Sequence, residues 1–281
     1  MGQLFVVPTP IGNLDDITFR AVKILKKVSL IAAEDTRVTR KLLKHFEIHT
    51  PMTSFYEHNE LVKLEVVFGA LKTGDVALVS DAGTPGISDP GFVLIREALQ
   101  RGVKVVPLPG PTALIPALIG SGMPTDRFIY LGFLSKKSGP RREQFKSVAE
   151  ERGTVVFYES AFRLGETLQD ALQVLGDRNI CVVREVSKLF EEFTRTTLLQ
   201  ASSFYKMNQV AGEIVVVVEG EDKDKVSWNK DKVVLALQHE MDRGVSLSQV
   251  AKIVAQESGW KKTEVYQLGL TLRQEEEIDE N

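Results

Sequence analysis

The stretch DVALVSDAGTPGISDPGFVLIREALQ (75–100) decides the fold class. It begins with a short apolar run at 75–79 and ends with apolar residues at helical spacing at 92–100. Between them lies a loop, 80–91, with three glycines and two prolines. A short apolar run bounded by turn residues is typical of a buried strand, and apolar residues three and four positions apart are typical of a helix. The stretch therefore predicts a strand, a long polar loop and a helix.

The same alternation of strand and helix patterns continues in both directions along the chain. It is typical of βαβ units in a mostly parallel sheet. A turn-rich break at 123–127 separates two such series, so we predict an α/β protein with two α/β domains, 1–123 and 124–220. The expected strands are 4–7, 29–34, 75–79, 103–108, 128–134, 154–159, 179–185, 193–196 and 212–220, and the expected helices are 17–28, 39–46, 59–74, 92–100, 112–122 and 162–175.

The chain beyond residue 220 differs in composition. Residues 220–231 are charged and nearly free of large apolar side chains, which is typical of a linker. Three helical patterns follow and predict a small C-terminal helical domain at 229–281. Ser246 as an N-cap and Gly259 at a turn fit a helix-turn-helix, and a helical tail that only packs or dimerises fits equally well.

Composition and charge narrow the class of protein. Of the 281 residues, 43% are hydrophobic and 26% are charged, as in globular proteins, and no apolar run approaches the roughly 18 residues of a membrane span. The single cysteine, Cys181, is expected to be a buried thiol. We expect a cytoplasmic protein with no membrane partner.

The charge is unevenly distributed. The net charge is −3, but residues 274–281 hold five acids and no base, so the remaining chain carries +2. Lysine and arginine gather in 17–49 and in 127–146. Such clusters suit the phosphate backbone of a nucleic acid, and a solvated helix face is the alternative for each of them.

Glycine- and proline-rich loops follow several of the expected strands. Neither a GxxxxGK[ST] loop nor a GxGxxG after the first strand is present, which argues against phosphoryl and hydride transfer. Open α/β sheets bind ligands at the carboxyl ends of their strands, and glycine lets the backbone approach a ligand closely. Asp81 and Asp89 suit ribose hydroxyls or a cation, although Ser88 and Asp89 before Pro90 also fit a helix N-cap. The loops are 7–13, 80–91, 107–113 and 130–135.

Eight motifs occur in the order that one known family shows. They are VPTPIGNLDDITFRA (7–21), AEDTRVTRKLL (33–43), SDAGTPGISDPG (80–91), PLPGPTA (107–113), YLGFL (130–134), YES (158–160), VVREVSKLFEE (182–192) and GEIVVVVEG (212–220). Together they resemble the ribosomal small-subunit RNA (cytidine-2′-O)-methyltransferase family, also called ribosomal RNA small subunit methyltransferase I, of the tetrapyrrole-methylase superfamily. EDTR together with SDAGTPxISDPG is specific for this family.

The resemblance implies two α/β domains of tetrapyrrole-methylase type with S-adenosylmethionine (SAM) in the cleft between them, in a homodimer. It implies 2′-O-ribose methylation of a cytidine in 16S ribosomal RNA of the small ribosomal subunit. The cofactor-binding residues that it implies are Asp81, Ala82, Gly83, Thr84, Ile87, Ser88, Asp89, Leu108, Pro109, Gly110, Pro111, Leu131, Gly132, Phe133, Ala211 and Gly212.

Methyl transfer to a hydroxyl requires alignment of the nucleophile, methyl group and sulfur, and a group that takes the proton. No metal is needed, and we expect none. The candidates for the base or the substrate side are Glu34, Asp35, Arg37, Glu159, Glu185 and, if burial holds it near neutral, Lys188. A helix N-cap at Asp35 with Arg37 paired to an acid is the alternative. The expected RNA contacts are Arg40, Lys41, Lys136, Lys137, Arg141 and Arg142.

One departure from the family pattern leaves rival functions open. The sequence YESAFR has Ala161 and Phe162 where the family usually has proline and histidine. Either an acid/base group is lost there or the position only packs. One rival is a methylase for a small molecule such as a tetrapyrrole precursor, which would not need the basic clusters. The other is a module that binds SAM or RNA without catalysis.

Overall fold

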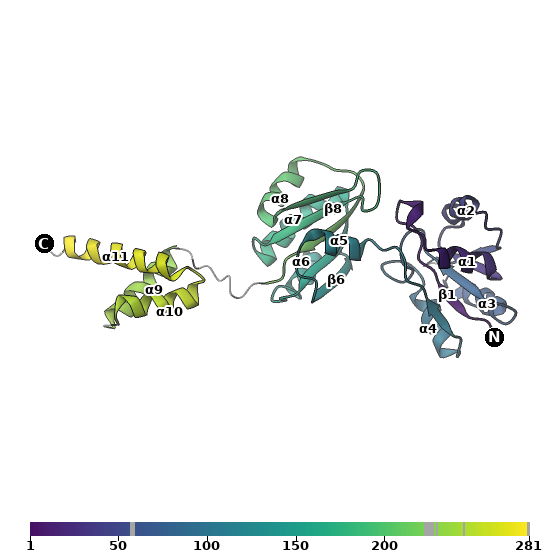
Figure 1. Ribbon diagram of the computed structural model, residues 1–281, viewed down its shortest axis with the longest axis horizontal. Helices are drawn as coiled ribbons and strands as arrows, with labels where there is room; N and C mark the ends of the chain where they lie inside the picture. Colours follow the sequence, from purple (N-terminus) through teal and green to yellow (C-terminus); the bar gives the residue numbers. More distant parts are fainter. Residues whose placement is uncertain (57–59, 222–227, 229, 244, 280–281) are drawn as a thin grey trace. The chain divides into compact units, whose positions relative to one another are not determined.

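A computed structural model describes residues 1–56, 60–221, 228, 230–243 and 245–279 (Figure 1). The chain divides into two compact units, Met1–Gly220 and Glu221–Asn281, which are described separately below. Most of the predicted linker, 222–227 and 229, lies outside the described residues, as do 280–281 of the acidic tail. Within the described residues, no helix combines the length and the apolar character that crossing a membrane requires.

The first sheet of the larger unit is parallel throughout. Its strand order is β3-β2-β4-β1-β5, so β1 and β4 lie side by side at its centre. All four residues of β4 are buried, which explains why its sequence is a continuous apolar run. The strands are β1 (Leu4–Val6), β2 (Leu30–Ala33), β3 (Met52–Ser54), β4 (Val76–Val79) and β5 (Val105–Pro107).

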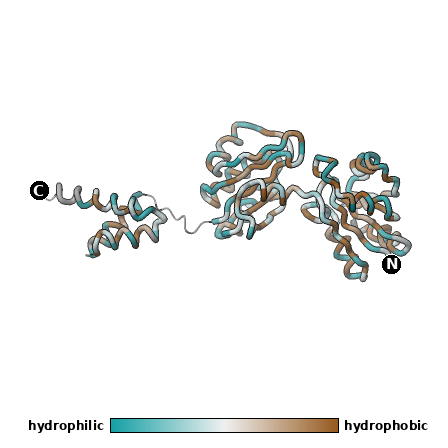
Figure 2. Tube along the Cα trace, in the orientation of Figure 1, coloured by the Kyte–Doolittle hydropathy of each residue, from teal (hydrophilic) through white to brown (hydrophobic). Residues whose placement is uncertain are grey.

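Helices cover both faces of this sheet, as βαβ connections require. One core cluster joins Leu25 and Leu43 to one face, and another joins Phe68 and Leu94 to the opposite face. Figure 2 shows hydrophobic residues running along the strands of both sheets. The helices are α1 (Phe19–Lys27), α2 (Thr36–His45), α3 (Glu60–Leu71) and α4 (Phe92–Gln100), with a 3-10 turn at Leu14–Asp16.

The second sheet of the same unit has the order β6-β7-β10-β8-β9 and is mixed. Only β6 and β7 are parallel, while β7–β10, β10–β8 and β8–β9 are antiparallel. The expectation of a mostly parallel sheet is wrong here, because a short loop without a helix joins β8 to β9 and allows only antiparallel pairing. The strands are β6 (Phe128–Phe133), β7 (Thr154–Ser160), β8 (Asn179–Arg184), β9 (Glu192–Thr197) and β10 (Glu213–Val218).

Helices also cover both faces of the second sheet. Phe145, Leu168 and Leu198 pack with Phe157 and Val216 in one core cluster. On the other face, Leu118 of α5 packs with Val183 and Val215. Since α5 packs on the second sheet, the chain leaves the first sheet before residue 114. We predict the domain boundary after residue 123, so the change of sheet comes earlier in the chain than that boundary. The helices are α5 (Leu114–Ser121), α6 (Ser138–Lys146), α7 (Leu164–Leu175) and α8 (Leu198–Met207), with a 3-10 turn, η2, at Ala161–Arg163.

Within its described residues, the smaller unit has three helices around its own core. They are α9 (Lys230–Asp242), α10 (Leu247–Ser258) and α11 (Lys262–Asp279). Val233, Val250 and Val265, one from each helix, are fully buried together. Ser246 is the N-cap of α10, and Gly259 ends that helix in the left-handed conformation that glycine favours.

Candidate active site

A cleft opens where the loops after β1 and β4 meet the second sheet and its connecting loops. The two loops are joined by paired backbone hydrogen bonds between Thr9 and Gly83, both 2.9 Å long. The Thr84 hydroxyl ties the β4 loop to the Pro111 carbonyl at 3.0 Å. The cleft has a volume of about 350 Å³, within the range of small-molecule sites. It is lined by Ile11, Ala82, Gly83, Thr84, Ile87, Ser88, Asp89, Thr112, Ala113, Phe133, Tyr158, Glu159, Ser160, Ala161, Gly212, Glu213, Ile214 and Val215.

The β4–α4 loop forms one wall because its backbone takes conformations that few residues adopt. Gly83 and Gly86 have φ of 81° and 85°, and Ser88 has φ of 61°. A Cβ on Gly91 would lie 2.7 Å from Leu78, so the loop returns to the sheet only with glycine there. Gly91 is the N-cap of α4, and its φ is 126°. The N-cap predicted for Ser88 and Asp89 is therefore wrong, because the helix begins after Gly91, and the Asp89 side chain lines the cleft.

Tyr158 and Phe133 of the second sheet line the facing wall, and Tyr130 packs against Tyr158. The Tyr130 hydroxyl is 2.7 Å from the Ser88 hydroxyl and so connects the β4 loop to β6. Tyr158 makes edge contacts with the rings of Tyr130 and Phe133. Burial is the main cause that raises the pKa of both tyrosines. They therefore stay neutral at physiological pH and give this wall an aromatic, uncharged surface.

Asp89 is the carboxyl group of the cleft with the most altered ionisation. Burial first, and then the nearby charges of Glu34 and Asp81, raise its pKa to about 7, against a smaller opposing effect of a hydrogen bond from Ser80. A carboxyl with a pKa near the working pH exchanges protons readily under physiological conditions. Asp89 is therefore suited to proton transfer inside the cleft.

The β4–α4 loop is hydrogen-bonded at Asp81 to the cluster of Glu34, Asp35 and Arg37. Asp35 donates its backbone N–H to Asp81 at 3.0 Å, and the Asp81 N–H donates to Glu34 at 3.2 Å. Asp35 caps α2 and binds Arg37 at 2.6 Å, which lowers the pKa of Asp35 to about 2. Among the described residues that line the cleft, none belongs to this cluster. The structure therefore agrees with the alternative interpretation, in which Asp35 is the N-cap of α2 and Arg37 pairs with it.

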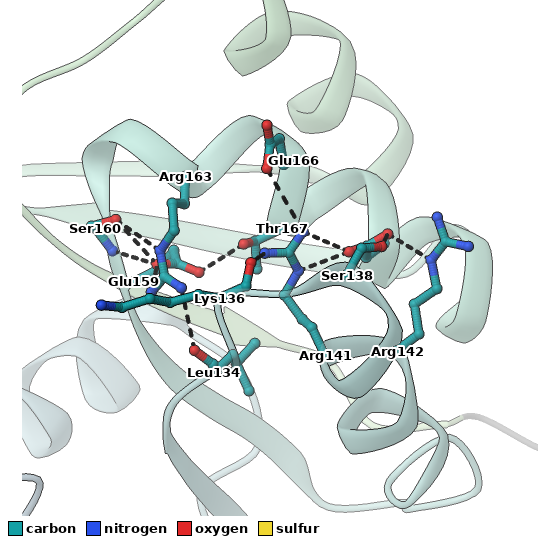
Figure 3. A network of polar contacts seen from close by, with 11 residues as sticks. Leu134, Lys136, Ser138, Arg141, Arg142, Glu159, Ser160, Arg163, Glu166 and Thr167 are labelled. Atoms are coloured by element: carbon teal, nitrogen blue, oxygen red, sulfur yellow. Dashed lines mark hydrogen bonds and ion pairs between the residues drawn. The ribbon is translucent and has the colours of Figure 1, made fainter.

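Glu159 reaches the cleft wall, but its carboxylate is held inside the protein. It lies 2.5 Å from Arg163 and accepts hydrogen bonds from Thr167 at 2.7 Å and from the Ser160 N–H at 2.6 Å (Figure 3). Its side chain has no exposed surface. The carboxylate is enclosed and paired with Arg163, and its hydrogen bond from the Ser160 N–H fixes the turn there.

Two arginines predicted to contact RNA belong to a buried ion cluster (Figure 3). Arg141 is 1% exposed and lies 2.7 Å from Asp170, whose side chain is 4% exposed. Arg142 binds the other oxygen of Asp170 at 2.7 Å and stays partly exposed. The expectation for Arg141 is wrong, because its guanidinium is enclosed and neutralised. Lys136 and Lys137 are exposed, as an RNA contact requires.

Lys188 bridges the rim of the cleft. Its Nζ lies 2.8 Å from Glu185 and 3.1 Å from Glu213, and its methylenes fill the space beside Gly12, which has φ of 147°. Burial lowers the pKa of Lys188, but the two carboxylates outweigh burial and the pKa is raised. The hypothesis of a neutral Lys188 base is therefore wrong. Glu185 is committed to the same ion cluster, and its pKa is lowered, first by its hydrogen bond with Lys188.

The predicted cofactor residues divide into two groups. Half of them line the cleft: Ala82, Gly83, Thr84, Ile87, Ser88, Asp89, Phe133 and Gly212. Among the described lining residues we do not find the others: Asp81, Leu108, Pro109, Gly110, Pro111, Leu131, Gly132 and Ala211. Ile11, Thr112 and Ala113 lie in the predicted loops 7–13 and 107–113, whereas sequence reasoning assigned no cofactor contact to the lining residues Tyr158, Ser160, Glu213, Ile214 and Val215. Tyr158 and Ser160 flank Glu159 in the YES motif, which was the available signal.

The altered YESAFR motif leaves the cleft intact. Ala161 lines the cleft, whereas the Phe162 side chain is 84% exposed and is not one of the described residues that line it. A residue at position 162 therefore reaches solvent in this unit, which favours the interpretation that no cleft group is lost.

Comparison with known sequences agrees with the motifs. Residues 3–202 match the family model for tetrapyrrole (corrin/porphyrin) methylases. A ribosomal RNA small subunit methyltransferase I from Synechocystis sp. is 44% identical over 97% of this chain and 99% of its own. Proteins of the same name from Escherichia coli O157:H7 and Bacillus subtilis are 43% and 40% identical, over 96% and 95% of this chain and 95% and 93% of their own.

Solved structures show the same fold at low identity. Uroporphyrin-III C-methyltransferase from Thermus thermophilus, in complex with S-adenyl homocysteine, has a TM-score of 0.56 at 18% identity, over 78% of this chain and 97% of its own. A diphthine synthase has a TM-score of 0.61 at 14% identity, over 78% of this chain and 90% of its own. The predicted fold is confirmed: two α/β domains of tetrapyrrole-methylase type, with a helical C-terminal region.

Proposed function

Because the chain belongs to the tetrapyrrole methylase family, and within it to the ribosomal RNA small subunit methyltransferase I group, we propose that it methylates the ribose 2′-oxygen of a cytidine in 16S ribosomal RNA. It is a SAM-dependent methyltransferase. The observation that carries the proposal is the 44% identity over nearly the whole of both chains. Transfer of a labelled methyl group to small ribosomal subunits tests it directly.

The residues of the cleft fit SAM. Ala82 and Gly83 of the β4 loop line the cleft with little side-chain bulk, and Phe133, Ile214 and Val215 offer apolar surface to a flat ring. Asp89 and Glu213 place negative charge in the same space, which suits a sulfonium and an ammonium group. When bound, SAM supplies a methyl group on a positively charged sulfur. The chain then has to orient the ribose and remove the hydroxyl proton.

We assign removal of that proton to Asp89. Asp89 lines the cleft, and burial raises the pKa of its carboxyl to about 7, which suits a group that takes and releases a proton near neutral pH. The other cleft carboxylates are engaged, Glu159 with Arg163 and Glu213 with Lys188. The Ser88–Tyr130 hydrogen bond next to Asp89 holds the β4–α4 loop against β6 of the second sheet. It therefore fixes the position of the Asp89 carboxyl group.

The proposal includes a small ribosomal subunit as the substrate, a homodimer as the active form and the cytoplasm as the site of action. Exposed Arg40 and Lys41 on α2, Lys136 and Lys137 before α6, and the partly exposed Arg142 supply positive charge for RNA phosphates. An active form of two chains agrees with the resemblance, and ribosomal subunits are available in the cytoplasm.

Reversing the charge of Lys136 and Lys137 should weaken binding to small ribosomal subunits. If each lysine neutralises one phosphate, the slope of log K against log salt should fall by about 1.4 to 1.8. Lys136→Glu/Lys137→Glu is compared with Lys104→Glu, an exposed lysine whose backbone carbonyl pairs with Leu4 at the opposite end of the first sheet. Filter binding at several salt concentrations measures the slope. An unchanged slope would remove these lysines from the interface.

Restoring the family histidine at position 162 should have little effect. Since Phe162 is exposed, Phe162→His should change the free energy of unfolding by less than about 0.5 kcal/mol. The methylation rate should stay within about twofold of the original, because no cleft contact changes. Initial rates with saturating SAM check this. A rate increase of tenfold or more would show that the histidine takes part in the reaction in relatives.

A further inference from the structure

The loop between β8 and β9 presents two large apolar side chains at the rim of the cleft. Leu189 is 89% exposed and Phe190 is 67% exposed. They follow Lys188, whose Nζ lies 3.1 Å from Glu213 of the cleft wall. Two residues of chain span at most about 7 Å, so the backbone of Phe190 stays close to that of Lys188. We call Leu189 and Phe190 the apolar tip, and it lies beside the cleft.

Two consecutive turns form this loop. The Lys188 N–H donates to the Glu185 carbonyl at 2.9 Å, and the Glu191 N–H donates to the Lys188 carbonyl at 3.2 Å. Leu189 and Phe190 are therefore the two central residues of the second turn. Glycine, proline, asparagine, aspartate and serine are the usual residues at such positions. Two large apolar side chains are not required by the turn, and they bury little surface in the fold.

The base of the loop is held in place at the cost of backbone strain. Glu185 and Ser187 have φ of 53° and 66°, in the left-handed region that residues other than glycine rarely adopt. Between them, Val186 is buried in the core cluster that includes α5. The Ser187 N–H donates to Glu191 at 2.6 Å, and the Ser187 hydroxyl donates to the Asp16 carboxylate. Strain that a fold maintains often marks a functional segment, and here it fixes the position of the apolar tip.

The charges around the apolar tip favour an uncharged ligand group. Among the described residues at the base of the loop, acids outnumber cations. The acids are Asp16, Glu185, Glu191, Glu192 and Glu213, and the cations are Arg184 and Lys188. This negative surrounding repels a phosphate. A nucleobase carries no charge, and its flat face stacks on an aromatic ring.

The size of the apolar tip also fits a single base. Even two fully exposed aromatic residues would offer at most about 500 Å² of surface. Each partner in a standard protein interface contributes roughly 800 Å². The tip by itself is therefore too small to hold a second protein chain, whereas one aromatic ring matches the face of one base.

We propose that Phe190 stacks on a base of the substrate RNA next to the methylated cytidine, with Leu189 beside that base. This inference rests on the proposed function, because it takes RNA as the substrate. The apolar tip holds the neighbouring base outside the cleft while the target ribose lies inside it. Phe190 therefore determines affinity for RNA and not the rate of the chemical step.

Steady-state methylation of small ribosomal subunits by the full chain tests the stacking contact. Phe190→Ala should raise KM for the subunits about tenfold, as expected for the loss of one stacked base, with kcat and the Kd for SAM unchanged. Phe190→Trp keeps an aromatic face and should retain the original KM. Phe190→Leu keeps apolar bulk without a ring and should behave like Phe190→Ala, so an original KM in this variant would overturn stacking. Phe204→Ala, at a half-exposed aromatic residue of α8, is the matched control and should leave KM unchanged.

Filter binding of the subunits at several salt concentrations separates stacking from charge. Phe190→Ala should weaken binding and leave the slope of log K against log salt unchanged, because no phosphate contact is lost. A smaller slope would show that the tip acts through phosphates and would overturn stacking. A changed oligomeric state of Phe190→Ala in analytical ultracentrifugation, together with a raised KM, would make the tip an interface between copies of the chain instead.

The same measurements separate this inference from the proposed function. If the original protein methylates subunits and Phe190→Ala retains its KM, the tip holds no base although the function stands. If the original protein methylates no RNA but Phe190→Ala weakens subunit binding at an unchanged slope, the tip contact stands and the function fails. If the original protein methylates no RNA and Phe190→Ala binds subunits equally well, both proposals fail.

Discussion

Replacing Asp89 with asparagine should lower kcat for methyl transfer by about 10² to 10³-fold, the usual contribution of a positioned base. Asparagine keeps the size of the side chain but accepts no proton. The Kd for SAM, measured by calorimetry, should change much less than kcat. Asp126→Asn, at an exposed position, is the matched control and should retain full activity.

The pH dependence gives the same prediction a second test. Only the deprotonated Asp89 accepts a proton, so kcat/KM, which reports the free enzyme, should rise with pH through an inflection near 7. Glu34→Gln removes a charge that raises the pKa of Asp89, so it should move the inflection to lower pH. If Asp89→Asn retains both the rate and the inflection, another group takes the proton.

Asp89 should also reduce stability at the pH where it works. Its folded-state pKa lies above the usual value, so between about pH 4 and pH 7 the folded state binds more protons than the unfolded state. Stability from this group is therefore present at low pH and is lost as pH rises through 7. Asp89→Asn should have a Tm at pH 8 at or above that of the original protein, as expected where activity and stability conflict.

The largest stability effect is expected at Asp170. This carboxylate neutralises the buried Arg141 and also accepts hydrogen bonds from Ser138 and Arg142. Asp170→Ala would leave the buried Arg141 guanidinium with only Glu166 at 4.0 Å and the Lys136 carbonyl at 3.4 Å, and this should lower the free energy of unfolding by about 3 to 5 kcal/mol. Urea denaturation followed by circular dichroism measures the loss. Glu143→Ala breaks an exposed pair with Lys146 and should cost less than about 1 kcal/mol.

A double variant separates the buried charge from lost packing. Arg141→Met/Asp170→Leu replaces both charged groups by apolar ones of similar size and should recover most of the stability that Asp170→Ala loses. If the double variant is as unstable as Asp170→Ala, packing and the Ser138 and Arg142 contacts explain the loss. If Asp170→Ala itself is as stable as the original protein, the ion pair contributes nothing to folding.

Three strands of the first sheet could be predicted from the sequence, because β1, β2 and β4 are almost entirely buried. The runs at 4–7, 29–34 and 75–79 contain β1, β2 and β4. Sequence reasoning missed β3, since its three residues MTS are half-buried and form no apolar run. It also missed α8, Leu198–Met207, whose mixed apolar and polar residues lack a clear amphipathic stripe.

The sequence predicted the part of the candidate site that a single continuous segment forms. The glycines at 80–91 predicted a loop against a ligand, and the loop lines the cleft. The facing wall comes from segments about 40 to 130 residues further along the chain, and only the family resemblance, at Phe133, Gly212 and the YES motif, indicated part of it. The burial of Arg141 could not be predicted, because its partner Asp170 lies on another helix and local charge density says nothing of such pairs.

The central claim is tested most directly by methyl transfer to ribosomal subunits. Small subunits from cells that lack this gene are incubated with the purified chain and methyl-labelled SAM, and nuclease digestion with mass spectrometry locates the label. We predict one labelled site, a cytidine methylated on its ribose 2′-oxygen. Absence of label on the RNA, while SAM still binds tightly, would contradict the account and favour a small-molecule substrate.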